Sequence, residues 1–184
     1  MSSLSIKDDD GVLHEFAKGI SALEVVDKIK ENNITPIAVE IDGIDKDLSF
    51  KIEKDCKMKI ITGKSKEGLY ILRHSCAHLL AQAVTTLFPE AKPTIGPPVD
   101  NGFYYDFFME PINEQDLKNI EKLMKKIIKK RLNVVREEYD NKTIRKMFSK
   151  NKFKMEILDE KVGEEAGTSV YRQGDFVDCV EDLM

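Results

Sequence analysis

The segment Arg73-His74-Ser75-Cys76-Ala77-His78-Leu79-Leu80 lies within a longer apolar repeat in a chain of 184 residues. Apolar side chains recur there every three or four positions, which predicts one long helix over residues 69–87 that Pro89 ends. The predicted packing stripe of this helix consists of Leu69, Leu72, Cys76, Leu79, Leu80, Ala83 and Leu87. His74 and His78 then lie together on the opposite side of the helix, one turn apart.

The face that carries the two histidines is a candidate functional site. It also carries Ile71 and Ala81, so we expect another element to cover it and to enclose His74 and His78 in a cleft. Histidines at i and i+4 can bind one metal ion or hold one water, but two surface histidines can share this spacing by chance. The pair alone is a weak indication, and its interpretation depends on polar partners from other segments.

Candidate partners come from three later segments. Lys154 lies in an alternating run over residues 153–157, which predicts a strand that directs Lys154 into a cleft; the alternative is a solvent-facing lysine. Asp178 ends another predicted strand, where a carboxylate also suits a turn. The other candidates are Tyr104 or Tyr105 and Cys179. These side chains are distant in sequence, so only the fold can bring them to the histidines.

A zinc site is a second interpretation of the same residues. His74, His78 and Cys179 would suit zinc, but the sequence offers no convincing fourth ligand, so we expect no metal and no cofactor. The chain also lacks a P-loop, a GxSxG elbow, an HExxH motif and a CxxC pair. An ATP-dependent activity within these residues is therefore not expected.

The remainder of the second half predicts mixed secondary structure. Asn113 and Asp116 indicate the start of a helix whose expected buried face consists of Leu117, Ile120, Leu123, Met124, Ile127 and Ile128. Strands are predicted around a Pro/Gly turn at 93–98 and 102–107 and again at 134–139, 153–158 and 169–177, with a short helix at 143–148. Because helices and strands do not alternate strictly, we expect an α+β fold with a long helix against a mixed or antiparallel sheet.

The first 62 residues predict a separate small domain. Ser21 and Glu24 form the pattern of a capping box, which starts a helix that reaches about Asn33. Strands are predicted at 4–7, 12–16, 37–41, 49–52 and 58–62, with turns at Asp-Gly pairs. This order suggests a ubiquitin-like β-grasp domain over residues 1–62, with a linker at 63–68 and a second domain over 63–184.

Charge is distributed unevenly along the chain. The net charge of −4 argues against a nucleic-acid partner, but residues 118–154 hold 14 Lys/Arg and 4 Asp/Glu, a local excess of ten positive charges. Such a segment can be the binding surface for a polyanion, or only the solvated face of a lysine-rich helix. The sequence leaves both interpretations open.

Composition restricts the class of protein further. The chain is 41% hydrophobic and 34% charged, enough for a packed core, and has no apolar run of the roughly 18 residues of a membrane span. Its start lacks the basic and apolar regions of a secretion signal. The three cysteines are odd in number and widely spaced, which argues against a disulfide framework. We expect a cytoplasmic protein.

Several segments together resemble one family. Residues 73–80, Ile95-Gly96-Pro97-Pro98, Gly102-Phe103-Tyr104-Tyr105-Asp106, Ile157-Leu158-Asp159-Glu160 and Gln173-Gly174-Asp175-Phe176-Val177-Asp178 resemble the second, editing domain of threonyl-tRNA synthetases in order and spacing. Residues 1–62 are similar to the TGS domain that precedes it. The histidine pair is shared with the alanyl-tRNA editing family. The resemblance covers nearly the whole chain, whereas the family's class II ligase core and anticodon-binding domain lie outside it.

The resemblance implies a function for the candidate residues. It implies hydrolysis of mischarged seryl-tRNA(Thr), with the acceptor end of tRNA(Thr) as partner, in an enzyme that is a homodimer at full length. By resemblance, His74 and His78 contact the terminal adenosine or the water, and Lys154 positions water or stabilises negative charge. Asp178 would recognise the serine amino group, while Tyr104 or Tyr105 and Cys179 would line the substrate pocket. The base is not assigned.

The end of the chain departs from the family pattern. After this aspartate the family continues x-Cys-Arg-Gly-Pro-His, whereas here Cys179 follows Asp178 directly and no histidine comes after it. We interpret this as a truncated or frameshifted fragment, or an artificial end. The alternative function is a catalytically inactive tRNA-binding or regulatory module.

Overall fold

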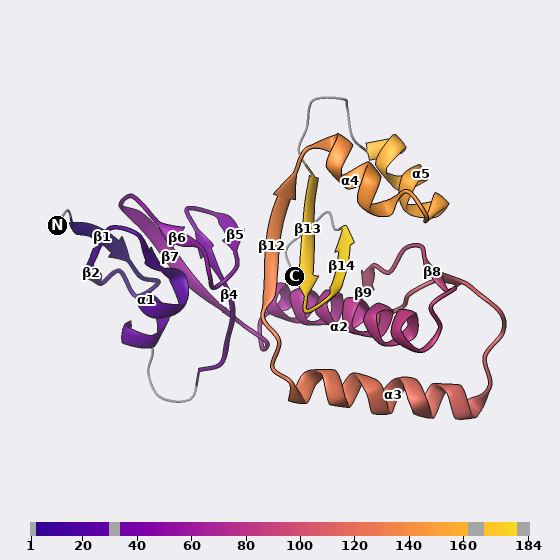
Figure 1. Cartoon of the computed structure of the whole chain (residues 1–184). Helices are drawn as coiled ribbons and strands as arrows, with labels where there is room; N and C mark the ends of the chain where they lie inside the picture. The colour runs from indigo at the N-terminus through magenta and orange to yellow at the C-terminus, as the bar shows by residue number, and fades with distance from the viewer. Residues whose placement is uncertain (1–2, 30–33, 162–167, 180–184) are drawn as a thin grey trace. The chain divides into compact units, whose positions relative to one another are not determined.

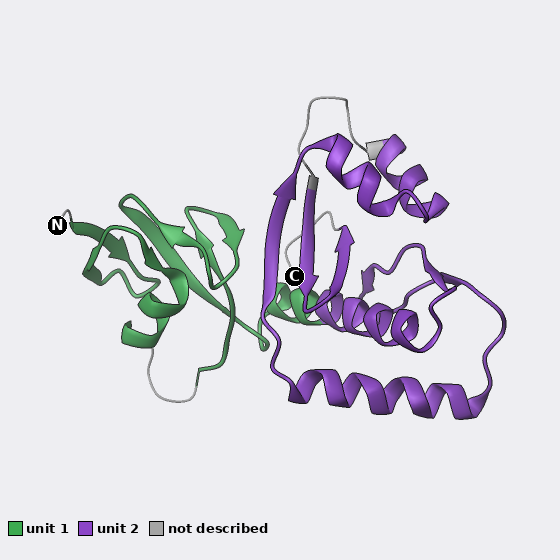
Figure 2. Ribbon diagram, viewed as in Figure 1, with its two compact units in different colours: residues 1–72, 183–184 green, residues 73–182 purple. Residues whose placement is uncertain are grey.

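A computed structural model describes residues 3–29, 34–161 and 168–179 (Figure 1). The chain divides into two compact units, residues 1–72 with 183–184 and residues 73–182, which are described separately (Figure 2). Within the described residues, no helix combines the length and the apolar character needed to cross a membrane.

The first unit is built on a five-stranded sheet of order β2-β1-β7-β4-β5, in which β1 and β7 are parallel and the other pairs antiparallel. The strands are β1 Ser3–Lys7, β2 Leu13–Ala17, β4 Pro36–Ile41, β5 Ile44–Lys46 and β7 Cys56–Thr62, and β3 Ile20–Ser21 pairs with β6 Lys51–Ile52. Together with helix α1, Ala22–Ile29, this order is the predicted β-grasp arrangement. Of the predicted strand 49–52, only 51–52 forms.

The core of this unit lies between the sheet and α1. Val25 and Val26 of α1 pack with Ile6, Val39 and Met58 of the sheet, all fully or almost fully buried. The capping box is confirmed, because the Ser21 N–H donates to Glu24 Oε2 at 2.9 Å and the Glu24 N–H donates to Ser21 Oγ at 3.3 Å. The end of the predicted helix at 30–33 lies outside the described residues.

Helix α2, Lys66–Leu87, begins three residues earlier than predicted. Its first turns belong to the first unit, where Ile71 packs with Ala38 and Ile61. The division between the two compact units therefore lies inside α2, after Leu72. Gly68 permits the close approach, since a Cβ there would lie 2.0 Å from the Thr62 carbonyl oxygen.

The second unit combines α2 from Arg73 onward with an antiparallel sheet of order β12-β13-β14. Its elements are α3 Glu114–Lys129, β12 Val134–Tyr139, α4 Asn141–Phe148, α5 Lys152–Lys161, β13 Thr168–Gln173 and β14 Phe176–Cys179. Two short ribbons complete it, β8 Lys92–Pro93 with β11 Phe107–Phe108 and β9 Pro98–Val99 with β10 Gly102–Phe103. Figure 1 shows α3 alongside α2, and their apolar side chains share one core. The predicted α+β class is confirmed.

The predicted strand at 153–158 is wrong, because this segment is helix α5. The Asn151 side chain accepts from the backbone N–H groups of Phe153 and Lys154, which caps the first turn of the helix. Lys, Met, Glu and Leu also favour a helix over a strand. Lys154 and Leu158 of α5, one turn apart, are buried.

The two predicted packing stripes are only partly correct. In α2, Leu69, Leu72 and Leu87 are exposed, whereas both sides of the helix are covered: Leu79 and Ala83 pack toward α3, and Ala77 and Ala81 are fully buried. In α3, which the Asn113–Asp116 capping box begins as predicted, Leu117 and Ile128 are exposed, 56% and 60%. The stripe of α3 is narrow, with Ile120 and Ile127 buried, two turns apart.

We expect Gly68→Ala to destabilise the chain although alanine favours a helix by roughly 1 kcal/mol. The added methyl meets the Thr62 carbonyl, so the free energy of unfolding should fall by about 1–3 kcal/mol in urea titrations. Gly102→Ala is the matched control, since a Cβ at Gly102 meets nothing within 4 Å. A more stable Gly68→Ala protein would contradict this packing.

Candidate active site

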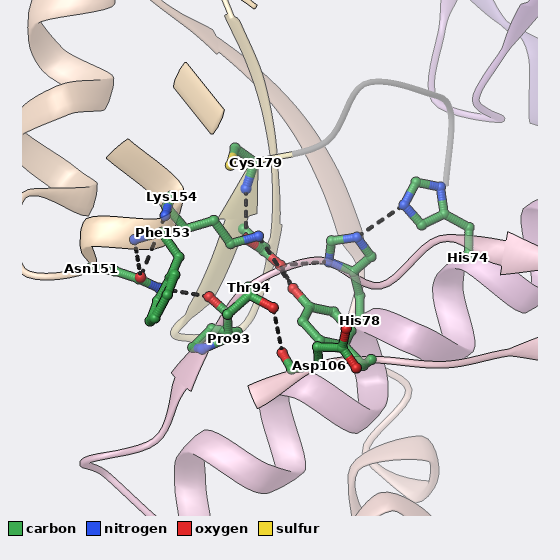
Figure 3. Close-up of polar contacts among 11 residues, drawn as sticks. His74, His78, Pro93, Thr94, Asp106, Asn151, Phe153, Lys154 and Cys179 are labelled. Atoms are coloured by element: carbon green, nitrogen blue, oxygen red, sulfur yellow. Dashed lines mark hydrogen bonds and ion pairs between the residues drawn. The ribbon is translucent and has the colours of Figure 1, made fainter. Parts of the chain in front are cut away.

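The centre of the second unit holds a buried carboxylate, Asp178 of β14, surrounded by hydrogen-bond donors. Figure 3 shows how His74, His78, Lys154 and Cys179 lie in this region. The Tyr105 hydroxyl donates to Asp178 Oδ2 at 2.6 Å, and the Cys179 N–H donates to Oδ1 at 2.9 Å. Lys154 Nζ lies 2.8 Å from Oδ1. Lys154 Nζ also donates to the Tyr105 hydroxyl at 3.2 Å, so the three side chains form a closed ring of polar contacts.

The two histidines of α2 extend this cluster. His78 Nδ1 lies 3.2 Å from Asp178 Oδ2, close enough for an ion pair although the angle is not that of a hydrogen bond. His78 Nε2 and His74 Nε2 are 3.1 Å apart, which requires one of them to carry a proton and the other to accept it. Both rings are buried, and that of His78 meets Tyr105 edge to face. The expectation that the histidine face is covered is confirmed.

Electrostatics fix the ionisation of the two central groups. Burial alone would raise the pKa of Asp178, but the adjacent Lys154 ammonium and the contact with His78 outweigh burial and hold that pKa well below its usual range. Burial, the negative charge of Asp178 and the hydrogen bond to it raise the pKa of Tyr105. Asp178 is therefore ionised and Tyr105 is a neutral donor at physiological pH.

The structure brings together the side chains of His74, His78, Tyr105, Lys154 and Asp178. Tyr104 is 46% exposed and lies outside the hydrogen-bonded ring. Cys179 contributes its backbone N–H, while its side chain packs in the core with Ile144, Leu158 and Val170. In the described part of the chain, no group of three His, Cys, Asp or Glu side chains is placed to hold a metal ion.

Sequence reasoning missed Asn151, which sets the position of Lys154. Besides capping α5, its side-chain amide donates to the Pro93 carbonyl at 2.7 Å and so ties the helix to ribbon β8–β11. Gln82 acts in the same way on α2, donating to the Gln173 carbonyl at 3.0 Å. An asparagine two residues before Phe153 is a recognisable N-cap signal, whereas the tertiary contact of Gln82 has no local signature.

Comparison of the sequence with known proteins indicates the family to which it is related. No protein-family model matches the chain. A threonine–tRNA ligase of Thermoplasma acidophilum is 45% identical over 169 residues, 92% of this chain and 24% of the relative. Those of Symbiobacterium thermophilum and Francisella philomiragia are 40% and 43% identical over 93% and 95% of this chain, and 27% and 28% of their own lengths.

This chain belongs with the N-terminal region of threonine–tRNA ligases. It spans about a quarter of the length of these relatives. The matched region includes both units, and the predicted resemblance to threonyl-tRNA synthetases is thereby confirmed.

Asp178→Asn should destabilise the chain by about 3–5 kcal/mol at pH 7, because Lys154 would remain buried without its counter-charge. Since the pKa of Asp178 is lowered by folding, its stabilisation is complete above an unfolded-state pKa near 3.9 and is lost as pH falls below it. Urea titrations should therefore show a smaller difference between wild type and variant at pH 3 than at pH 7.

The control for this experiment is Asp159→Asn, which removes a largely exposed carboxylate that pairs with Arg145. Its effect should stay below about 1 kcal/mol at both pH values. Equal destabilisation by the two variants, or a difference that does not change with pH, would show that the buried pair is unimportant for stability.

Proposed function

We propose that this chain carries a hydrolytic editing site that removes serine from mischarged Ser-tRNA(Thr). The observation that carries the proposal is the buried ring of Lys154, Tyr105 and Asp178 beside a histidine pair, in a region related to threonine–tRNA ligases. A synthetase for threonine needs such a site, because one methyl group contributes only about 1–3 kcal/mol to discrimination. A second site that admits serine and excludes threonine corrects the error.

The reaction is hydrolysis of the ester between serine and the terminal ribose of tRNA. A water attacks the carbonyl carbon, a base takes a proton from that water, and the departing ribose oxygen receives a proton. The facing Nε2 atoms of His74 and His78 form a pair in which one nitrogen accepts and the other donates, as these two proton transfers require. The ammonium of Lys154 suits the negative charge that develops on the carbonyl oxygen.

Asp178 organises this site in our proposal. Three donors and the His78 ring already surround its carboxylate, so a substrate ammonium would have to replace one of these groups to be recognised there. We assign to Asp178 the positioning of Lys154 and Tyr105, with recognition of the serine amino group as a further role that depends on such an exchange. The scheme uses side chains of this chain as base, acid and electrostatic stabiliser and includes no metal step.

Deacylation assays with the full 184-residue chain test the proposal. Ser-tRNA(Thr) should decay faster with the protein than without it, whereas Thr-tRNA(Thr) should decay at the same rate in both. Full activity should survive chelator treatment, while loss of activity with the chelator would favour the zinc site of His74, His78 and Cys179. Decay of both substrates at the protein-free rate would overturn the proposal.

Lys154→Met should lower the rate of Ser-tRNA(Thr) deacylation about 100- to 1,000-fold, as expected when a stabilising positive charge is removed. Because this variant leaves Asp178 buried without its partner, the double variant Lys154→Met/Asp178→Asn tests folding separately. The double variant should melt closer to wild type and remain inactive. Lys150→Met, an exposed lysine of the same segment, is the control and should keep full activity.

A tRNA-binding module without catalysis is the second candidate function, and the surface of α3 favours it. Lys118, Lys122, Lys125 and Lys129 are spaced four, three and four residues apart, which places them in one stripe opposite Ile120 and Ile127. Lys125 is engaged by Glu121 at 2.5 Å. The positive segment predicted from the sequence thus includes a continuous exposed stripe that suits RNA phosphates.

The triple variant Lys118→Gln/Lys122→Gln/Lys129→Gln tests this surface. If the stripe contacts phosphates, tRNA binding should weaken and the slope of log K against log salt should become shallower by roughly 0.7–0.9 per lost contact. Replacing Lys7, Lys54 and Lys57 of the first unit by glutamine removes the same charge and should leave the slope unchanged. Identical slopes for both triples would exclude α3 as the contact.

A further inference from the structure

Two phenylalanines and a lysine form an aromatic group at the start of α5, directly before Lys154 in the chain. The rings of Phe108 on β11 and Phe153 on α5 have centroids 5.5 Å apart and a tilt of 46°. Lys152 Nζ lies 4.9 Å from the Phe153 centroid and 5.5 Å from that of Phe108. Phe108 is 58% exposed. We call Phe108, Phe153 and Lys152 the aromatic platform.

The platform is held in place by structure that is independent of its own ring contacts. Phe108 pairs with Lys92 in the β8–β11 ribbon, and Asn151 ties that ribbon to the start of α5 through the Pro93 carbonyl. The first turn of α5 is capped by the same Asn151 side chain. A large aromatic ring that stays mostly in solvent on a fixed support is suited to a flat ligand.

The backbone connects the platform to the polar cluster. Phe153 directly precedes Lys154, and both backbone N–H groups meet the Asn151 side chain, as Figure 3 shows. Phe107, the neighbour of Phe108, stacks on Tyr105 with centroids 4.9 Å apart. Consecutive Cα atoms are only about 3.8 Å apart, so the backbone of each phenylalanine adjoins a member of the polar cluster or of its aromatic support, while its own ring points to a different side.

We propose that the aromatic platform binds the single-stranded 3′ end of tRNA, with a base next to the terminal adenosine stacked on Phe108 and Phe153. The inference rests on the proposed editing function and names a subsite of it. Every base has a π face, and aromatic side chains beside a cation are the recurring means of holding single-stranded nucleic acid. The ammonium of Lys152 lies over the ring faces that a base would use, and its flexible exposed stem can turn outward to the adjacent phosphate.

Direct binding of RNA to the full chain tests the platform without any need for catalysis. The probe is the tetranucleotide 5′-ACCA-3′ with 2-aminopurine in place of the penultimate base, because stacking on an aromatic ring quenches its fluorescence. We expect quenching by wild type and by Phe108→Tyr. Phe108→Ala should weaken binding about 5- to 150-fold and abolish the quenching, as expected for one lost base stack.

Leu13→Ala, which removes an exposed apolar side chain of the first unit, should bind as wild type does. Lys152→Gln should make the slope of log K against log salt shallower by roughly 0.7, as expected when one phosphate contact to a single strand is lost. Failure of wild type to bind the probe, or binding to Phe108→Ala with unchanged affinity and quenching, would overturn the proposal.

A kinetic comparison distinguishes RNA binding by the platform from a merely structural role of its residues. Phe108→Ala and Phe153→Leu should lower kcat/KM for Ser-tRNA(Thr) but not for 3′-O-seryladenosine, which lacks every nucleotide before the terminal one. Equal losses on both substrates would mean that the variants damage the polar cluster, and the proposal would fall. If wild type hydrolyses neither substrate, the editing function fails, and the fluorescence experiment still decides whether the platform binds RNA.

Discussion

The ion pair between Lys154 and Asp178, both almost completely buried, is the contact on which the second unit depends. Removing two charges from water is costly, and the cost is offset only when both charges have a full set of partners. Asp178 obtains these from Tyr105, Cys179 and His78, and Lys154 obtains a further acceptor from Tyr105. Helix α5, strand β14 and the segment before β11 must therefore meet at one point.

Helix α2 can contribute side chains to the polar cluster because other parts of the second unit cover it on two sides. Small residues make this possible: Ala77, Ala81 and Ala83 are fully buried and let neighbouring elements approach the helix closely. Leu79 and Ala83 pack toward α3, which leaves the side of His74 and His78 for the polar cluster. The same helix thus supplies part of the apolar core and two imidazoles of the site.

The sequence predicts an element correctly where local contacts decide its structure. It does not do so where one short pattern of residues is compatible with both a helix and a strand. The capping boxes at Ser21 and Asn113 are local contacts, so the sequence located both helix starts. The run around Lys154 alternates over too few residues to separate a strand from a helix, and the Asn151 cap decides for a helix.

The site shows the same division between local and tertiary information. All five members of the cluster were among the predicted residues, but sequence could not choose between Tyr104 and Tyr105. Adjacent residues in extended chain point to opposite sides, and only the packing of Phe107 on Tyr105 determines which side faces Asp178. For the same reason the Cys179 side chain lies in the core although its backbone N–H serves the site.

The proposed editing function would place a strict demand on this site, because a pocket that yields by the width of a methyl would accept threonine as well as serine. A cluster held by single contacts could yield in this way at small cost. In the ring of Asp178, Tyr105 and Lys154, moving any one side chain breaks at least two polar contacts, and burial prevents water from replacing them. The network that makes the buried charges tolerable would therefore also give the pocket the rigidity that steric exclusion requires.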